Sequence, residues 1–294
     1  MVYIGGMEVW TIQKLLGWMV EYFGAKAVDS PRFSAELLLA HALKWKRIEL
    51  YTHFDAAVGA QRLAELRVLV KRAGEHEPIA YLVGATEFYS MTIRVGRECL
   101  IPRPETEMLV ERAIDLLRKQ AGEQQVLDLC TGSGCIAAAI AKNHPAAMVV
   151  ATDLCEKALA IAAENVRTHG LEARVRLLCG DLFEPVIAGL DAAKFDLIAC
   201  NPPYVSAGEY EKLDRNVRDY EPKKALDGGA DGLDVYRRIA ARVGEFLKDD
   251  GALLLEIGCG QADTVRGLLE AAGLKNIQVF KDHAKLERVV MGRK

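Results

Sequence analysis

From residue 104 to the end of the chain, short apolar runs of β type alternate with segments whose apolar residues recur at helical spacing. This alternation predicts a mostly parallel sheet with helices on both faces. The expected strands are 125–130, 147–152, 174–179, 195–200, 251–257, 276–281 and 286–291. The expected helices are 105–121, 133–143, 155–169, 232–247 and 261–272. Sheets of this kind bind ligands outside the carboxyl ends of their strands, so we expect the functional site there.

The first quarter of the chain has a different pattern. Apolar residues recur at helical spacing in 9–24, 30–43 and 59–76, and the dipeptide Ser30-Pro31 is typical of a helix start. Short β-type runs follow, at Ile79–Val83, 87–90 and 91–95. We therefore expect three parts, which are a helical domain over 1–78, a β-hairpin linker over 79–103 and an α/β domain over 104–294.

Charge and cysteine content restrict the class of protein. The net charge is −3, and residues 1–78 hold ten Lys and Arg against nine Asp and Glu, so neither the chain nor its first part is a basic arm for duplex DNA. The seven cysteines form no C-x-x-C pair, which favours a reduced cytoplasmic setting and gives no metal site. Apolar runs stay well short of the roughly 18–20 residues that cross a bilayer, so no membrane association is expected.

A glycine-containing turn follows the first strand of the α/β part. The residues of this turn are expected to contact a cofactor, and they are Cys130, Thr131, Gly132, Ser133 and Gly134. The second strand ends in Asp153, where an acidic side chain can accept hydrogen bonds from ribose hydroxyls. The third ends in Asp181 and Leu182, where an acceptor and an apolar side chain suit an adenine ring. Each aspartate alone could instead cap a helix, but the succession favours a nucleotide-like cofactor.

The tetrapeptide Asn201-Pro202-Pro203-Tyr204 directly follows the fourth expected strand. Its prolines hold the turn extended and leave the carbonyl of Pro202 free as an acceptor. A planar amide or amino nitrogen is a weak nucleophile, because its lone pair is delocalised. We expect the Asn201 side-chain oxygen and the Pro202 carbonyl to bind the two N–H groups of such a nitrogen and to direct it at the sulfonium methyl of S-adenosylmethionine.

In this reading Asn201, Pro202 and Tyr204 are catalytic, and Tyr204 supplies a flat wall for the planar group. All four residues of the tetrapeptide, including Pro203, bind the substrate, and Asn201 also contacts the cofactor. Most of the rate gain would come from positioning and preorganised dipoles, without a charged general base.

Several stretches together resemble the release-factor glutamine N5-methyltransferase (HemK/PrmC) family over nearly the whole chain. They are residues 77–82 with Glu87-Phe88, 101–107, 128–134, 201–204, 220–222 with Ala225-Leu226, and 286–289. The tetrapeptide alone is shared with adenine and other amino-group methyltransferases, whereas Pro-Arg-Pro-Glu-Thr-Glu at 102–107 is more particular. The chain departs from the family at Cys130, where glycine is usual, so altered cofactor affinity is expected.

The resemblance implies a seven-stranded Rossmann-like class I methyltransferase sheet that binds S-adenosylmethionine. It also implies that the substrate is the glutamine of the Gly-Gly-Gln motif in bacterial class I peptide chain release factors, and that the helical domain helps to hold that protein. No stable nucleic-acid partner is expected. A monomer is the working expectation, although the sequence does not determine the oligomeric state.

Three questions stay open at this point. An adenine-N6 or guanine-N2 nucleic-acid methyltransferase would use the same tetrapeptide on an exposed base. A nucleotide-binding protein without methyl transfer would need the glycine turn but not the tetrapeptide. The long irregular stretch 205–232 could be a lid or only a solvated loop, and Arg103 could orient the hairpin or only carry surface charge.

Overall fold

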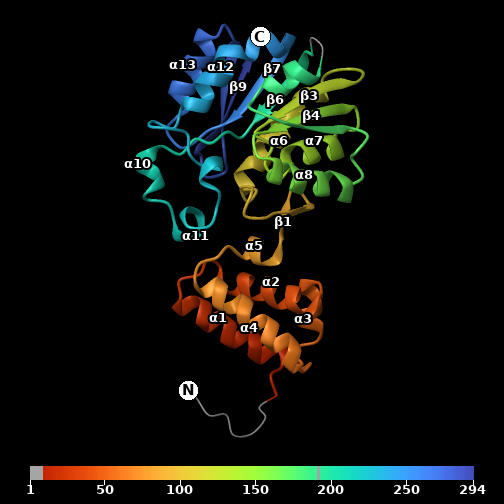
Figure 1. The fold of residues 1–294 in the computed structure, drawn as a ribbon, viewed down its shortest axis with the longest axis vertical. Helices are drawn as coiled ribbons and strands as arrows, with labels where there is room; N and C mark the ends of the chain where they lie inside the picture. The colour runs from red at the N-terminus through yellow and green to blue at the C-terminus, as the bar shows by residue number, and fades with distance from the viewer. Residues whose placement is uncertain (1–8, 191–192) are drawn as a thin grey trace. The chain divides into compact units, whose positions relative to one another are not determined.

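The structure is a computed structural model that describes residues 9–190 and 193–294 (Figure 1). The chain forms two compact units. The first contains the chain up to Gly84 together with Arg215–Tyr220, and the second contains Ala85–Asp214 and Glu221–Lys294. The division at residues 78 and 103 that we expected from the sequence stays a prediction.

The first unit is helical. Its helices before residue 85 are α1 (Ile12–Ala25), α2 (Pro31–Leu43), α3 (Arg47–Thr52), α4 (Ala60–Gly74) and α5 (Ile79–Val83). The three expected helical segments are confirmed as α1, α2 and α4, while α3 was not foreseen. Helix α2 starts at Pro31, where the missing N–H costs nothing because the first turn of a helix has no acceptor for it. Buried side chains such as Phe23, Leu38 and Leu66 form the core of this unit.

The expected β-type run Ile79–Val83 is wrong, because this segment is helix α5. A short apolar run does not distinguish a strand from a buried helical turn. Leu82 is buried in the core of the helical unit, which a helical turn allows. Gly84 ends the helix in the left-handed region at φ 79°, and its N–H donates to the carbonyl of Ala80 at 2.8 Å.

A β-hairpin opens the second unit, as expected within 79–103. Strands β1 (Ala85–Phe88) and β2 (Met91–Arg94) pair antiparallel. The side chain of Asn165 fixes the hairpin to the rest of the unit: its Oδ1 accepts from the N–H of Arg94 at 2.7 Å, and its Nδ2 donates to the carbonyls of Arg94 and Ser133 at 3.0 and 2.8 Å. Asn165 is fully buried, so the hairpin and the glycine turn share one support.

The described part of the second unit contains a seven-stranded sheet, as predicted. Its strands are β3 (Gln124–Leu129), β4 (Ala147–Asp153), β5 (Val175–Cys179), β6 (Phe195–Cys200), β7 (Leu247–Glu256), β8 (Lys275–Lys281) and β9 (Glu287–Arg293). They lie in the order β5-β4-β3-β6-β7-β9-β8, with β9 antiparallel to its two neighbours and the others parallel. The chain order reverses on the two sides of β3, and this is where open α/β sheets form a binding crevice.

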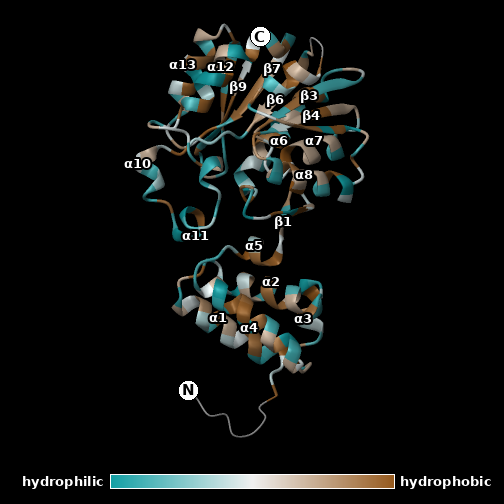
Figure 2. Ribbon diagram, viewed as in Figure 1, coloured by the Kyte–Doolittle hydropathy of each residue, from teal (hydrophilic) through white to brown (hydrophobic). Residues whose placement is uncertain are grey.

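Helices cover both faces of the sheet. They are α6 (Pro104–Leu117), α7 (Cys135–Asn143), α8 (Glu156–Thr168), α9 (Glu184–Gly189), α12 (Asp234–Phe246) and α13 (Ala262–Ala271). In Figure 1, α6, α7 and α8 lie on one face, and α12 and α13 lie on the other. Hydrophobic residues concentrate on the strands between these layers (Figure 2). Within the described residues, every helix is too short or too polar to cross a membrane.

The long stretch 205–232 contains short helices. They are α10 (Ala207–Tyr210), α11 (Arg215–Arg218) and the 3-10 turn η1 (Lys223–Ala225). Part of the stretch, Arg215–Tyr220, belongs to the helical unit, where the hydroxyl of Tyr220 donates to the carbonyl of Glu75 at 2.9 Å. The remainder belongs to the second unit, so this stretch is not simply a solvated loop.

Candidate active site

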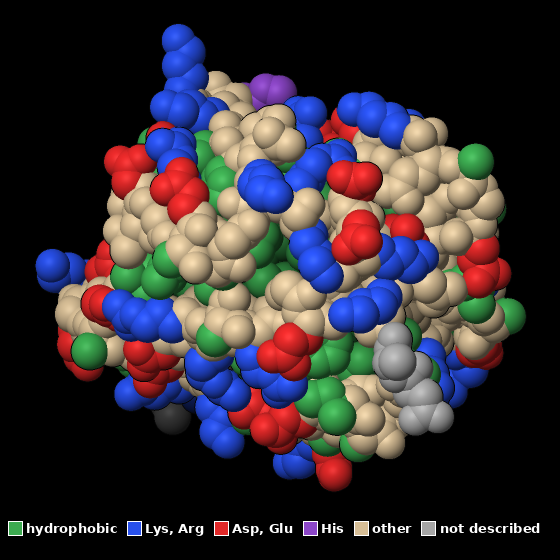
Figure 3. All heavy atoms as spheres, turned by 90° about the horizontal axis from the view of Figure 1, so that it is seen from above, with side chains coloured by type: hydrophobic (Ala, Val, Ile, Leu, Met, Phe, Trp, Pro, Cys, Tyr) green, Lys and Arg blue, Asp and Glu red, His purple; other side chains and the backbone are tan. Residues whose placement is uncertain are grey.

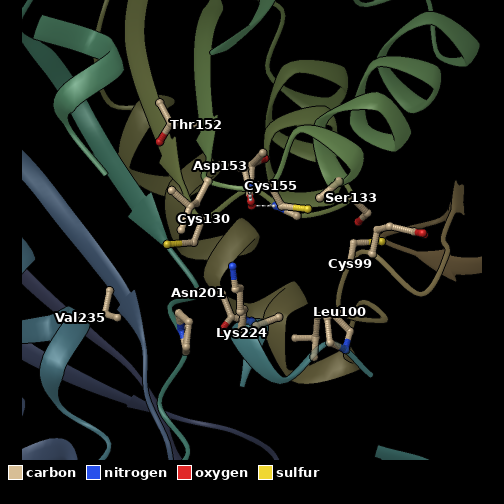
Figure 4. Close-up of a pocket in the computed structure, with 18 of the residues that line it drawn as sticks. Cys99, Leu100, Cys130, Ser133, Thr152, Asp153, Cys155, Asn201, Lys224 and Val235 are labelled. Atoms are coloured by element: carbon tan, nitrogen blue, oxygen red, sulfur yellow. Dashed lines mark hydrogen bonds between the residues drawn. The ribbon is translucent and has the colours of Figure 1, made fainter. Parts of the chain in front are cut away.

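A pocket of about 680 Å³ lies at the carboxyl ends of β3, β4, β5 and β6. This is where the sequence predicts the functional site. Its size is within the range of small-molecule sites. The expected site residues that line it are Cys130, Thr131, Gly132, Ser133, Asp153, Asp181, Leu182, Asn201 and Pro203. Figure 4 shows Cys130, Ser133, Asp153 and Asn201 around the same space. Gly134, Pro202 and Tyr204 are not among the lining residues.

The glycine turn is held in left-handed backbone conformations. Cys130, Gly132 and Gly134 have φ of 57°, 55° and 77°. At Gly134 a Cβ atom would lie 2.9 Å from the Cβ of Ala162, so this glycine permits the close approach of α8. At Gly132 only Cys99 is near, at 3.9 Å, so this position is open to the pocket.

Asp128, the residue that supports the turn from behind, was not assigned a site role from the sequence. It is fully buried, and its Oδ2 accepts hydrogen bonds from the Thr131 hydroxyl at 2.5 Å and the N–H of Ala137 at 3.2 Å. Burial raises the pKa of Asp128 to about 7. The carboxyl group therefore fixes the turn to the first turn of α7.

Asp153 connects two pocket walls. Its Oδ2 accepts from the N–H of Gly132 at 2.8 Å, and its Oδ1 accepts from the N–H of Cys155 at 2.8 Å. Burial raises the pKa of this carboxyl, while these backbone hydrogen bonds lower it. Each oxygen keeps a second lone pair, so Asp153 can still accept from a ligand hydroxyl. If Asp153 only capped helix α8, its bond to the N–H of Cys155 would be explained, but its bond to the N–H of Gly132 would not.

At the end of β5, Asp181 and Leu182 form the far wall of the pocket. Asp181 pairs with Arg238 of α12 at 2.6 Å, and both residues line the pocket. Leu182 is buried with φ 48°, and its carbonyl accepts from the Thr152 hydroxyl at 3.2 Å. Leu154 also lines the pocket. Unlike Leu182 it is exposed, at 62%, and it offers an apolar surface to a ligand.

The tetrapeptide begins where β6 ends. Asn201 lines the pocket, and its Nδ2 donates to the hydroxyl of Thr106 at 3.2 Å. The main chain of Tyr204 is fixed by Gln261, whose Nε2 donates to the Tyr204 carbonyl at 3.0 Å. Burial raises the pKa of the Tyr204 phenol to about 12, so this group stays protonated at neutral pH.

Arg103 has a clear structural partner in the described part of the chain. Its guanidinium is paired with Glu221, a carboxylate that is 5% exposed and that also accepts from the N–H of Ile101 at 3.1 Å. The Pro-Arg-Pro segment is thereby fixed to the Tyr-Glu-Pro segment 118 residues later. Both segments contribute lining residues, which are Pro102, Arg103 and Pro222.

Family models match both units of the chain. The PrmC N-terminal domain matches residues 14–84, and the methyltransferase small domain matches residues 106–217. Among solved structures, a methyltransferase from Pyrococcus furiosus is 17% identical with a TM-score of 0.51, and the match covers 80% of this chain and 99% of that chain. This likeness supports the methyltransferase fold.

Whole-chain relatives are more closely similar. A release factor glutamine methyltransferase of Geobacter sulfurreducens is 43% identical over 286 residues, which is 97% of this chain and 98% of the relative. One of Rhodopirellula baltica is 43% identical over 290 residues, or 97% of each chain. Identity at this level over both units confirms the resemblance drawn from the motifs, and the chain belongs to the release factor glutamine methyltransferase family.

Proposed function

We propose that this protein transfers the methyl group of S-adenosylmethionine to the side-chain amide nitrogen of the glutamine in the Gly-Gly-Gln motif of class I release factors. Membership of the family supports the substrate, and the pocket supports the cofactor. The observation that carries the mechanism is the orientation of Asn201, whose NH₂ group is bound to Thr106, so that Oδ1 is left as an acceptor at the pocket.

The chemistry of the lining residues fits S-adenosylmethionine. Asp153 would accept from the ribose hydroxyls, and the N–H groups after the glycine turn would face the carboxylate of the methionine part. Leu154 and Leu182 would pack on the adenine ring, with Asp181 as an acceptor for its amino group. When bound, this cofactor supplies an electrophilic methyl group on a positively charged sulfur.

The residues of the tetrapeptide would act on the acceptor amide. Asn201 Oδ1 and the carbonyl of Pro202 would accept its two N–H hydrogens and thereby direct the nitrogen lone pair into the pocket. Pro203 lines the same space, and the neutral Tyr204 ring would limit movement of the planar group. Positioning and fixed dipoles of this kind can each supply several kcal/mol of barrier lowering. As the N–CH₃ bond forms and the S–CH₃ bond breaks, the amide nitrogen would release one N–H proton to water, so no charged base is required.

The nucleic-acid alternative has less support. The net charge of the chain is −3, and Lys and Arg side chains are interspersed with Asp and Glu on the face seen in Figure 3, which is the face at the amino ends of the parallel strands. A single-stranded or flipped-base substrate usually requires a groove of one sign of charge. We assign the helical unit to holding the release factor. The free thiols of all seven cysteines support action in the cytoplasm, and a monomer suffices because the pocket is formed within one chain.

The test is to incubate the protein with S-adenosylmethionine and an unmodified class I release factor, and to map methyl incorporation by peptide mass spectrometry. We expect one methyl group, on the glutamine of the Gly-Gly-Gln motif. A release factor with that glutamine replaced by alanine is the control and should stay unmodified. Methylation at another position, or of nucleic acid alone, would overturn the assignment.

A further inference from the structure

Glu256, the last residue of β7, is a buried acidic side chain to which the mechanism above gives no role. It is 2% exposed and does not line the pocket. Its Oε2 is buried without a hydrogen-bond partner among the described residues. Burying a carboxyl group with an unsatisfied oxygen is costly, and such groups occur most often where function requires them.

The groups that face Glu256 come from several elements around the tetrapeptide. Thr106 on α6 and Asn201 after β6 lie beside the Glu256 carboxyl group, and these hydrogen-bonding side chains lower its pKa. Glu105 on α6 raises this pKa, and Arg288 on β9 lowers it. The phenols of Tyr204 and Tyr236 and the thiols of Cys135 and Cys200 also interact electrostatically with it. Tyr236 binds only the main chain of Glu256, because its hydroxyl donates to the Glu256 carbonyl at 2.8 Å.

The hydrogen-bond directions in this cluster are determined by the carboxylate. An ionised carboxylate only accepts, so a Thr106 hydroxyl that is directed at Glu256 donates its hydrogen there. Toward Asn201 the same hydroxyl can then only accept. The observed bond has this direction, from Asn201 Nδ2 to Thr106 Oγ1 at 3.2 Å. The NH₂ group of Asn201 is therefore held on the side of Thr106 and Glu256.

We propose that Glu256 is a positioning residue, which acts with Thr106 to fix the amide of Asn201 so that Oδ1 faces the acceptor nitrogen. The inference rests on the function proposed above. A protonated Glu256 could donate to Asn201 Oδ1, and the amide could then turn over and present NH₂ to the substrate. Two NH₂ groups repel each other, so the reaction needs the ionised form.

Burial raises the pKa of Glu256 to about 7, against the opposing effects of Thr106 and Asn201. Turnover should therefore fall as the pH decreases through about 7, because the carboxylate is lost in that direction. The effect on stability has the opposite sign. A carboxyl group with a raised folded-state pKa favours folding below its unfolded pKa and loses that contribution as the pH rises through the folded value.

The experiment compares single-turnover rates of the wild type and Glu256→Gln between pH 6 and 8.5, with saturating S-adenosylmethionine and an unmodified release factor. Glutamine keeps the shape of the side chain but can donate to Asn201. We expect a rate loss on the order of 100-fold at pH 8, the size that follows misplacement of a reacting group by about 1 Å. The fall in rate below about pH 7, which we call the acidic limb of the pH profile, should be absent in this variant. Its affinity for S-adenosylmethionine should change less than threefold, and its thermal stability at pH 8 should not decrease.

Asp196→Asn is the matched control. Asp196 is a half-buried carboxylate at the amino end of β6, paired with Lys248 at 2.7 Å and away from the tetrapeptide at the other end of that strand. This variant should keep the acidic limb. Thr106→Ser should retain most of the activity and Thr106→Val should lose it, a comparison that remains informative if Glu256→Gln does not fold.

A flat wild-type pH profile, or full activity of both Glu256→Gln and Thr106→Val, would overturn the inference while leaving the proposed function intact. A wild type that does not methylate the release factor would instead refute the proposed function. These two failures are therefore distinguishable.

Discussion

Asp153 Oδ2 accepts a hydrogen bond from the N–H of Gly132 at 2.8 Å, which joins the end of β4 to the glycine turn after β3. The same carboxylate binds the N–H of Cys155 through Oδ1. One side chain thus sets the spacing of the two neighbouring pocket walls and retains lone pairs for a ligand. Replacement of Asp153 should therefore weaken cofactor binding in two ways, by loosening the two pocket walls and by removing an acceptor for the ligand.

We expect Asp153→Ala to weaken S-adenosylmethionine binding by roughly 10- to 100-fold, because loss of a charged hydrogen-bond acceptor costs about 1.5–3 kcal/mol. Isothermal titration calorimetry gives the dissociation constant directly. Asp196→Asn, outside the pocket, serves as the comparison and should bind normally. Unchanged affinity in Asp153→Ala would remove this residue from the cofactor site.

Cys130 stands in the left-handed region at φ 57°, where a side chain other than glycine is strained by roughly 1–2 kcal/mol. Glycine relieves that strain but gains freedom in the unfolded chain, which costs about 0.5–1 kcal/mol. We therefore expect Cys130→Gly to be more stable than Cys130→Ala in urea unfolding. Alanine removes the sulfur and keeps the strained Cβ, so equal stabilities of the two variants would show that the backbone conformation at residue 130 does not disfavour a side chain.

The sequence predicts the α/β part of the fold well, because strand and helix periods differ and each strand is short and apolar. Every expected strand of the sheet is present, and β7 begins four residues early, at Leu247 and not at 251. The error at Ile79–Val83 has a local cause, since five apolar residues suit a helical turn as well as a strand. Helix α3 was missed because it is only six residues long.

The partners within the site could not be predicted in the same way. Asp153 and Asn201 are recognisable because they follow strands directly, and the topology brings strand ends together. Glu256 and Glu221 gave no such signal. The pair of Arg103 and Glu221 joins residues 118 positions apart, and the bond of Asn201 to Thr106 joins residues 95 positions apart. Only the packed structure selects one such pair among many.

We expect Arg103→Met to destabilise the second unit by about 3–5 kcal/mol, because it leaves the buried Glu221 carboxylate without its cation. The double variant Arg103→Met with Glu221→Gln should recover a substantial part of this loss. Urea unfolding of the wild type, both single variants and the double variant gives the coupling free energy. Additive losses would show that the pair does not hold the two pocket segments together.

The pKa of Asp128, raised to about 7 by burial, predicts a pH-dependent difference in stability. Its contribution to folding is present below the unfolded pKa of about 4 and is lost as the pH rises through about 7. The melting temperature of Asp128→Asn relative to the wild type should therefore rise from pH 4.5 to 7.5 and stay constant above. A constant difference over this whole range would show that Asp128 is ionised with an ordinary pKa.

Asn201 is the residue on which the mechanism depends most directly. We expect Asn201→Ala to lower kcat by about 10²–10³, the usual cost of removing one preorganised hydrogen-bonding group from a reacting centre. The loss should persist at saturating S-adenosylmethionine, because the variant impairs alignment of the acceptor amide as well as contact with the cofactor.

Asn201→Asp keeps the shape of the side chain and changes its charge. It keeps an acceptor oxygen but places a second carboxyl group beside the buried Glu256, and like charges at this distance disfavour ionisation of both. One of the pair should then stay protonated at neutral pH, and activity should recover partly as the pH is raised. Single-turnover rates from pH 6 to 9 measure this effect. Full activity of Asn201→Ala would exclude the proposed role of the Asn201 oxygen, whatever the behaviour of Asn201→Asp.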